Sequence, residues 1–104
     1  MSKREINLMS DTKQVLVKMG ANIRKARLRR NLSAELISEQ ANISTDTLSS
    51  IEKGIPTVSI GAYAAVLAVL QLGRDLEEVA LDEVGKQKFW EQNLYLRERA
   101  SKRK

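Results

Sequence analysis

The sequence predicts an all-α fold, with five short helices in one domain followed by a basic C-terminal tail. Three observations support this prediction. Apolar residues recur at helical spacing, and no useful length of chain alternates β-branched with polar residues. Serines precede several of the apolar stretches, where a helix start needs a cap. The 104 residues suit one domain of ordinary size.

The first helix is expected over residues 12–30, because its apolar residues repeat at i, i+3, i+7 and i+10 while basic residues lie away from them. Ser10 or Asp11 is expected to cap its start. A second helix is expected from Ser33, as its cap, to Ala41.

The third helix is expected from Ser44, its cap, to Lys53, with Gly54 directly after its end. Asn42 lies in the turn before it, and asparagine is the non-glycine residue that best tolerates a left-handed backbone. Ser38 must be small because the second and third helices cross there. The expected core between these helices consists of Ile37, Ile43, Leu48 and Ile51.

A fourth helix is expected from the cap Ser59 to about Leu72, with Gly73 ending it, and a short fifth one over residues 76–80. The predicted organisation is a flexible N-terminus (1–11), a helical domain (12–81) and a tail (82–104).

Composition excludes several classes of site. The chain has no cysteine and no histidine, so disulfides, thiolate metal sites and the usual general base are missing. Its glycines form no phosphate-binding loop. We therefore expect no enzyme activity, no metal and no cofactor.

Charge is distributed unevenly, with net values of +7 over residues 1–30, −7 over 31–85 and +5 over 86–104. Basic flanks suggest an anionic partner, nucleic acid first, although solvated tails are the alternative. The start of the chain has no apolar region typical of a secretory signal. The longest apolar stretch, 60–72, is shorter than the ~20 residues of a membrane span, so we expect a cytoplasmic protein.

Two short helices joined by a tight turn are the geometry of a helix-turn-helix, although an αα-corner that binds no DNA has it too. Residues 23–27, 32–38 and 43–54 resemble the Cro/C1-type (XRE) helix-turn-helix regulators. The resemblance implies a five-helix lambda-repressor-like domain that binds double-stranded DNA. Ala34, Asn42 and Thr45 stand where that family usually has Gln, Gly, and Arg or Gln.

Residues 56–72 resemble the HipB-like antitoxin branch of that family. This resemblance implies a repressor that is the antitoxin of a toxin–antitoxin operon, autoregulates its promoter and binds a HipA-like kinase. Two alternatives stay open. One is a stand-alone phage-type or metabolic repressor, and the other is a protein-interaction module without DNA binding.

In this geometry the N-terminal part of the third helix enters the major groove. The side chains expected to reach base edges are Thr45, Asp46, Ser49 and Ser50. Asp46 either accepts from cytosine N4 or only stabilises the first helical turn. These side chains are short, so DNA shape shares in the recognition. Phosphate contacts are expected from Arg24, Arg30, Ser33 and Lys53. Family members pair the positions of Arg27 and Glu52 as an internal ion pair.

Two further surfaces are expected to bind protein. Eleven of the 13 residues in 60–72 are apolar, so this helix must be covered on both sides. A second copy would cover Tyr63, Val66, Leu67 and Leu70, unless the segment after Gly73 does so. In the tail, aromatic anchors with a basic rim indicate a partner-docking segment or a helix that folds back. These tail residues are Phe89, Trp90, Leu94, Tyr95 and Arg97.

Overall fold

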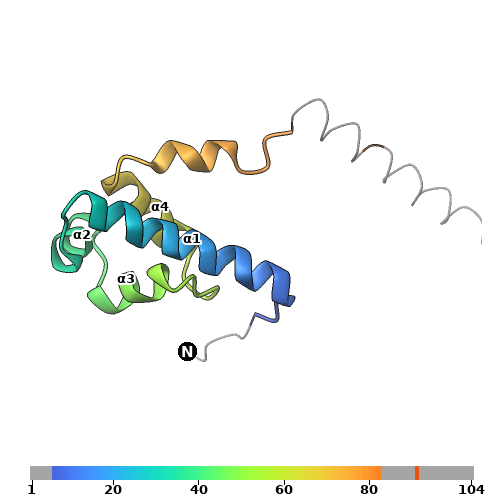
Figure 1. The fold of residues 1–104 in the computed structure, drawn as a ribbon, viewed down its shortest axis with the longest axis horizontal. Helices are drawn as coiled ribbons and strands as arrows, with labels where there is room; N and C mark the ends of the chain where they lie inside the picture. Colours follow the sequence, from blue (N-terminus) through green and yellow to red (C-terminus); the bar gives the residue numbers. More distant parts are fainter. Residues whose placement is uncertain (1–5, 83–90, 92–104) are drawn as a thin grey trace, which may run out of the picture.

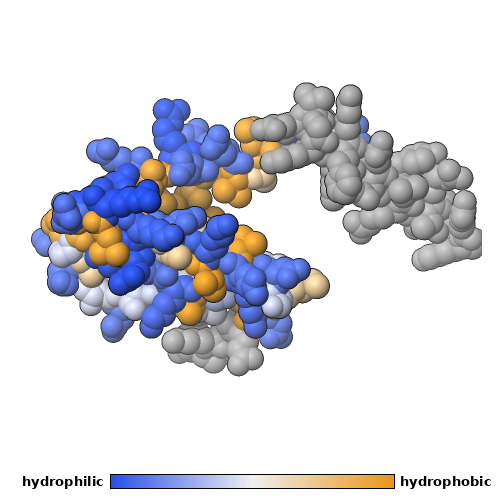
Figure 2. Space-filling view, viewed as in Figure 1, coloured by the Kyte–Doolittle hydropathy of each residue, from blue (hydrophilic) through white to orange (hydrophobic). Residues whose placement is uncertain are grey.

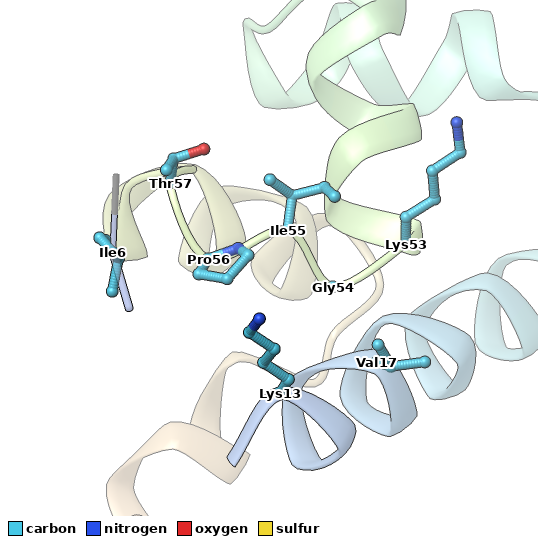
Figure 3. Close-up of a pocket in the computed structure, with 8 residues that line it drawn as sticks. All are labelled: Ile6, Lys13, Val17, Lys53, Gly54, Ile55, Pro56 and Thr57. Carbon is cyan, nitrogen blue, oxygen red and sulfur yellow. The ribbon is translucent and has the colours of Figure 1, made fainter. Parts of the chain in front are cut away.

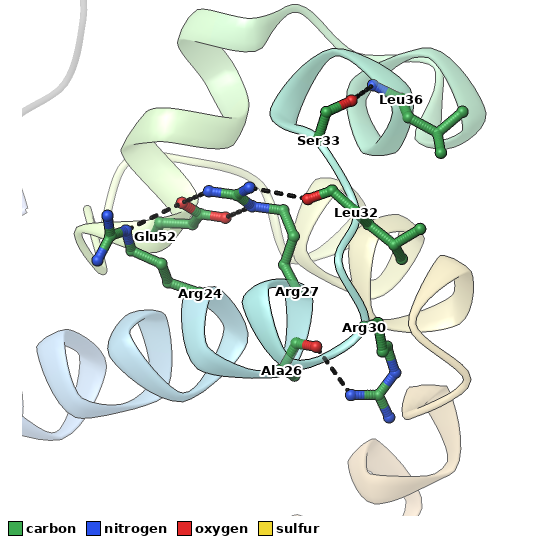
Figure 4. A network of polar contacts seen from close by, with 8 residues as sticks. All are labelled: Arg24, Ala26, Arg27, Arg30, Leu32, Ser33, Leu36 and Glu52. Atoms are coloured by element: carbon green, nitrogen blue, oxygen red, sulfur yellow. Dashed lines mark hydrogen bonds and ion pairs between the residues drawn. The ribbon is translucent and has the colours of Figure 1, made fainter.

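The computed structural model describes residues 6–82 and residue 91 of the chain (Figure 1). Within this part the elements are α1 (Ser10–Arg29), α2 (Ala34–Ala41), α3 (Thr45–Glu52), α4 (Ile60–Val69) and the 3₁₀ helix η1 (Gly73–Glu78). The prediction of an all-α fold with five helices is confirmed. Figures 1 and 4 both show α3 on one side of α1 and η1 on the other.

Serine side chains cap the N-termini of three of the helices, as predicted. The hydroxyls of Ser33, Ser44 and Ser59 each accept a hydrogen bond from the backbone N–H three residues later, at 3.0, 3.0 and 3.1 Å. The predicted cap of α1 is wrong. Its N-cap is Met9, which provides no side-chain acceptor, and both Ser10 and Asp11 lie inside the first turn.

The helices α1 to α4 all end in one backbone motif, in which a left-handed residue follows the last turn and the next N–H reaches back five residues. The left-handed residues are Asn31, Asn42, Gly54 and Gln71. At the end of α4, for example, the Leu72 N–H donates to the Leu67 carbonyl at 2.8 Å.

This motif corrects two predicted boundaries. Because Gln71 has a φ of 64°, α4 ends at Val69 rather than continuing to Leu72. Gly73 does not end α4 but begins η1, which lies earlier than predicted and is a 3₁₀ helix. Apolar composition alone did not reveal the left-handed glutamine.

The core lies between all four of these α-helices; α1 contributes Ile23 and packs against α3. Ile37, Leu48 and Ile51 are fully buried, Ser38 of α2 is buried, and Ile43 is half-buried. Among the described residues no helix is long and apolar enough to cross a membrane.

The predicted dimer surface on α4 is wrong for all four of its residues. They are buried within the single chain, with exposed fractions of 7% or less. The reason is that α4 packs against α2 on one side and η1 on another. The alternative, that the segment after Gly73 covers them, is the one the structure forms, so these four side chains are not free to contact a second copy.

Two glycines bring the backbone of α1 against the C-terminal end of α3. A Cβ atom at Gly20 would lie 2.6 Å from both the Gly54 nitrogen and the Ile51 carbonyl oxygen. A Cβ atom at Gly54 would overlap the Leu16 carbonyl, and Gly54 also has a φ of +73°. Only glycine fits at either position.

Tyr63 ties α4 to the loop that follows α3. Its hydroxyl donates to the Ile55 carbonyl at 2.9 Å, and burial raises the pKa of Tyr63 above its ordinary value. Tyr63→Phe is expected to lower the free energy of unfolding by ~1 kcal/mol at neutral pH, because the Ile55 carbonyl loses its donor.

The same residue predicts a loss of stability in alkali. The folded chain keeps the phenol proton to a higher pH than the unfolded chain, so this contribution is complete below about pH 10 and is lost as the pH rises through the raised pKa. Denaturant unfolding of wild type and Tyr63→Phe measures this difference. The measurements run from about pH 8 to 12, which brackets the ordinary tyrosine pKa of ~10. If the free energies of unfolding of the two proteins changed with pH in parallel, Tyr63 would not be the source of the alkaline loss of stability.

Candidate DNA-binding interface

Helix α3 is built with one apolar and one polar face. Leu48 and Ile51 point into the core, whereas Thr45, Asp46 and Ser49 are exposed. Positions four apart lie on the same helix face, so Thr45, Ser49 and the exposed Lys53 form one stripe. We call Thr45, Asp46, Ser49 and Lys53 the α3 stripe.

Ser50 is half-buried, so of the four predicted base-contacting residues it is the least accessible. Thr47 is occupied within the helix start, because its hydroxyl shares a 2.9 Å hydrogen bond with that of Ser44. The stripe therefore offers two hydroxyls, one carboxylate and one ammonium to a ligand.

An ion pair fixes the C-terminal end of α3 to α1 (Figure 4). The Arg27 Nε and Nη2 donate to the two Glu52 carboxylate oxygens at 2.7 and 3.1 Å, and Nη1 donates to the Leu32 carbonyl at 3.0 Å. Only 12% of the Arg27 side chain and 9% of the Glu52 side chain is exposed. The hydrogen bond to Glu52 raises the pKa of Arg27, so the guanidinium stays charged.

The other basic candidates differ in position. Arg24 lies 3.9 Å from Glu52 and is 61% exposed, so it is accessible beside the ion pair. Ser33 uses its hydroxyl as the α2 cap, but the N-terminus of α2 is exposed. Arg30 donates to the Ala26 carbonyl at 2.9 Å on the other side of α1 (Figure 4). Arg30 thus lies apart from Arg24, and its predicted phosphate contact stays a prediction.

Sequence reasoning missed a pocket beside the end of α3. It has a volume of about 390 Å³ and lies between α1 and the loop after α3 (Figure 3). Lys13 of α1 points towards this loop, whereas Lys53 points away from Lys13. Lys13 lies 40 positions before Lys53 in the sequence. No local pattern could have indicated that both residues line one pocket.

The comparison with protein families matches a helix-turn-helix domain over residues 18–80, more than half of the chain. The chain belongs to this helix-turn-helix family. The match includes α2, the turn at Asn42 and α3, so the α3 stripe lies on the second helix of the motif. A helix-turn-helix domain supports a DNA-binding regulator, and α3 has the place of the helix that enters the major groove in such domains. The comparison with curated proteins gave no match.

The predicted docking residues of the tail lie outside the described residues. Phe89, Trp90, Leu94, Tyr95 and Arg97 thus keep the status of a prediction, as do the predicted domain boundaries.

Proposed function

We propose that this helix-turn-helix protein is a sequence-specific repressor that binds operator DNA as a dimer. The exposed α3 stripe supports this proposal most directly. Its hydroxyls and the Asp46 carboxylate are free to contact base edges, because the residues that hold α3 in place lie on the opposite face. Lys53 at the end of the stripe is placed to contact a phosphate.

Two kinds of substitution test this division of roles. Lys53→Ala is expected to weaken binding to operator and random DNA alike and to lower the slope of log K against log[salt] by about 1. Lys18→Ala removes the same charge from an exposed α1 position and is expected to leave the slope unchanged. Salt titrations of DNA affinity measure both variants. If Lys53→Ala had the same slope as Lys18→Ala, Lys53 would not contact a phosphate.

Thr45→Ala and Ser49→Ala are expected to weaken operator binding by ~1–3 kcal/mol and to relax discrimination at particular base pairs. Gel shifts on operator fragments with single base-pair changes measure this effect. Equal losses on operator and random DNA would contradict base reading by these side chains.

We also propose that the chain is the antitoxin of a toxin–antitoxin operon that represses its own promoter. The resemblance of residues 56–72 to HipB-like antitoxins supports this role, and the partner would be a HipA-like kinase. Deleting residues 86–104 is expected to leave operator binding nearly intact while abolishing capture of the kinase. If a kinase gene adjoins this one but the two proteins do not co-purify, the stand-alone repressor is the better proposal.

One observation favours a second candidate, a protein-interaction module without DNA binding. Residues 6–82 hold nine Lys/Arg and nine Asp/Glu, so this part of the chain has no net charge. A neutral domain lacks the general attraction to phosphates that most DNA-binding domains have. A gel shift of the full chain against its own upstream DNA separates the two candidates.

A further inference from the structure

A basic pocket lies at the C-terminal end of α1, on the side that faces away from Glu52. It has a volume of about 400 Å³ and is lined by Asn22, Lys25, Ala26, Arg29, Arg30 and Leu72. Lys25, Arg29 and Arg30 are all exposed, and none forms an ion pair with another described residue. Three cations therefore surround one concave surface without a described counter-charge.

An acidic segment begins a few residues after this pocket. Asp75, Glu78 and Asp82 are exposed and form no ion pair among the described residues, whereas Glu77 is bound by Arg74 at 2.9 Å. No basic residue follows Arg74 within residues 75–82. We call residues 75–82 the acidic segment. Its negative charge is opposite to the positive charge of the basic pocket.

The acidic segment also carries exposed apolar surface. The exposed fractions are 68% for Val79 and 53% for Leu81. Figure 2 shows hydrophilic residues along η1 and apolar surface where this segment ends. Burying apolar side chains would add a favourable contribution that a purely ionic contact does not have.

The two surfaces are neighbours on the molecule, because Leu72 lines the pocket and directly precedes η1. A two-fold axis between two copies would place the pocket of each against the acidic segment of the other. Such a self-complementary arrangement is what a symmetric dimer requires. Opposite charges on the facing surfaces would favour it and set its register.

We propose that a second copy of this chain docks here, with its acidic segment in the basic pocket and the reverse contact formed at the same time. This inference rests on the proposed function only in that it supplies the interface of the proposed dimer. The pocket and the α3 stripe belong to different sides of α1, so docking leaves the stripe free for DNA. The α4 residues predicted from sequence take no part.

Charge reversal with complementation tests this interface. The pocket variant carries Lys25→Glu and Arg29→Glu, and the acidic-segment variant carries Asp75→Lys and Glu78→Lys. Each variant alone faces like charges at both contacts, so its dimer is expected to dissociate at least about 100-fold more readily than wild type. Mixed together, they regain opposite charges at both contacts and are expected to form a heterodimer of near wild-type affinity.

Sedimentation of the full-length proteins, separately and mixed, measures these equilibria. A control with Lys13→Glu and Lys18→Glu carries the same charge change on α1 outside the pocket and is expected to stay dimeric. One chain carrying all four reversals is also expected to dimerise, which shows that the substituted positions still allow folding.

Three outcomes would overturn the proposal: a monomeric wild type, variants that remain dimeric, or a mixture that does not re-associate. A pocket variant that stays dimeric but loses affinity for every DNA would make the pocket a phosphate contact instead. Failure of the proposed function would be a separate result, because it would appear as a wild-type protein that dimerises but binds no DNA.

Discussion

Gly54→Ala is expected to lower the free energy of unfolding by about 3 kcal/mol or more. Two costs add at this position. An alanine in the left-handed conformation costs roughly 1–2 kcal/mol, and its Cβ would overlap the Leu16 carbonyl of α1, an overpacking that costs roughly 1–3 kcal/mol. Because the clash is with backbone, no side chain can move aside to relieve it. Thermal or denaturant unfolding measures the loss.

Three companion variants separate the two costs. Gly54→Asn keeps a residue that tolerates the left-handed conformation, so it retains mainly the clash. Gly20→Ala sits in a regular helix and also isolates the clash, with its Cβ 2.6 Å from the Gly54 nitrogen. Gly61→Ala is the matched control, because only the Ser59 hydroxyl lies near, at 3.8 Å. It is expected to be neutral or to stabilise by up to ~1 kcal/mol. Equal effects at Gly54 and Gly61 would contradict the close contact of α1 with α3.

Glu52→Ala is expected to destabilise the fold by about 3–5 kcal/mol, because it leaves the Arg27 guanidinium largely buried without its counter-charge. Arg24→Ala is the matched control. Arg24 is 61% exposed and lies 3.9 Å from the same carboxylate, so its loss is expected to cost less than ~1 kcal/mol. Chemical denaturation of the purified variants measures both.

Replacing both partners, as Arg27→Met with Glu52→Leu, is expected to recover much of the stability, because no buried charge remains unpaired. Recovery should fall short by ~1 kcal/mol, since the Leu32 carbonyl also loses its donor. If Glu52→Ala and Arg24→Ala cost the same, the ion pair does not hold α3 to α1.

Helix starts could be predicted from sequence where a side chain caps the helix, but not where the N-cap residue has no hydrogen-bonding side chain. The starts of α2, α3 and α4 were predictable because a serine hydroxyl accepts a hydrogen bond from a free backbone N–H, at Ser33, Ser44 and Ser59. Met9, at the start of α1, offers no such group. The end of α4 was missed because a left-handed Gln71 is uncommon, and apolar residues continue past the true end.

The long-range contacts mark the limit of pattern reasoning. A glycine inside a helix looks like a weak position, and nothing near Gly20 indicates that it meets Gly54, 34 positions later. Apolar composition showed that α4 must be covered, but it could not decide between a second copy and the segment after Gly73, where η1 lies. The partnership of Arg27 with Glu52 was accessible only through family resemblance, and the structure forms it.

The two faces of α3 also bear on how its binding specificity can diverge. The residues that hold the helix, Leu48, Ile51 and Glu52, share no position with the exposed Thr45, Asp46 and Ser49. Exchanging the exposed side chains therefore changes what the helix presents to DNA at little cost in folding. If α3 reads operator DNA as proposed, duplicated copies of such a gene can acquire new operators by a few substitutions, and a designer can vary these three positions in a library while the scaffold stays constant.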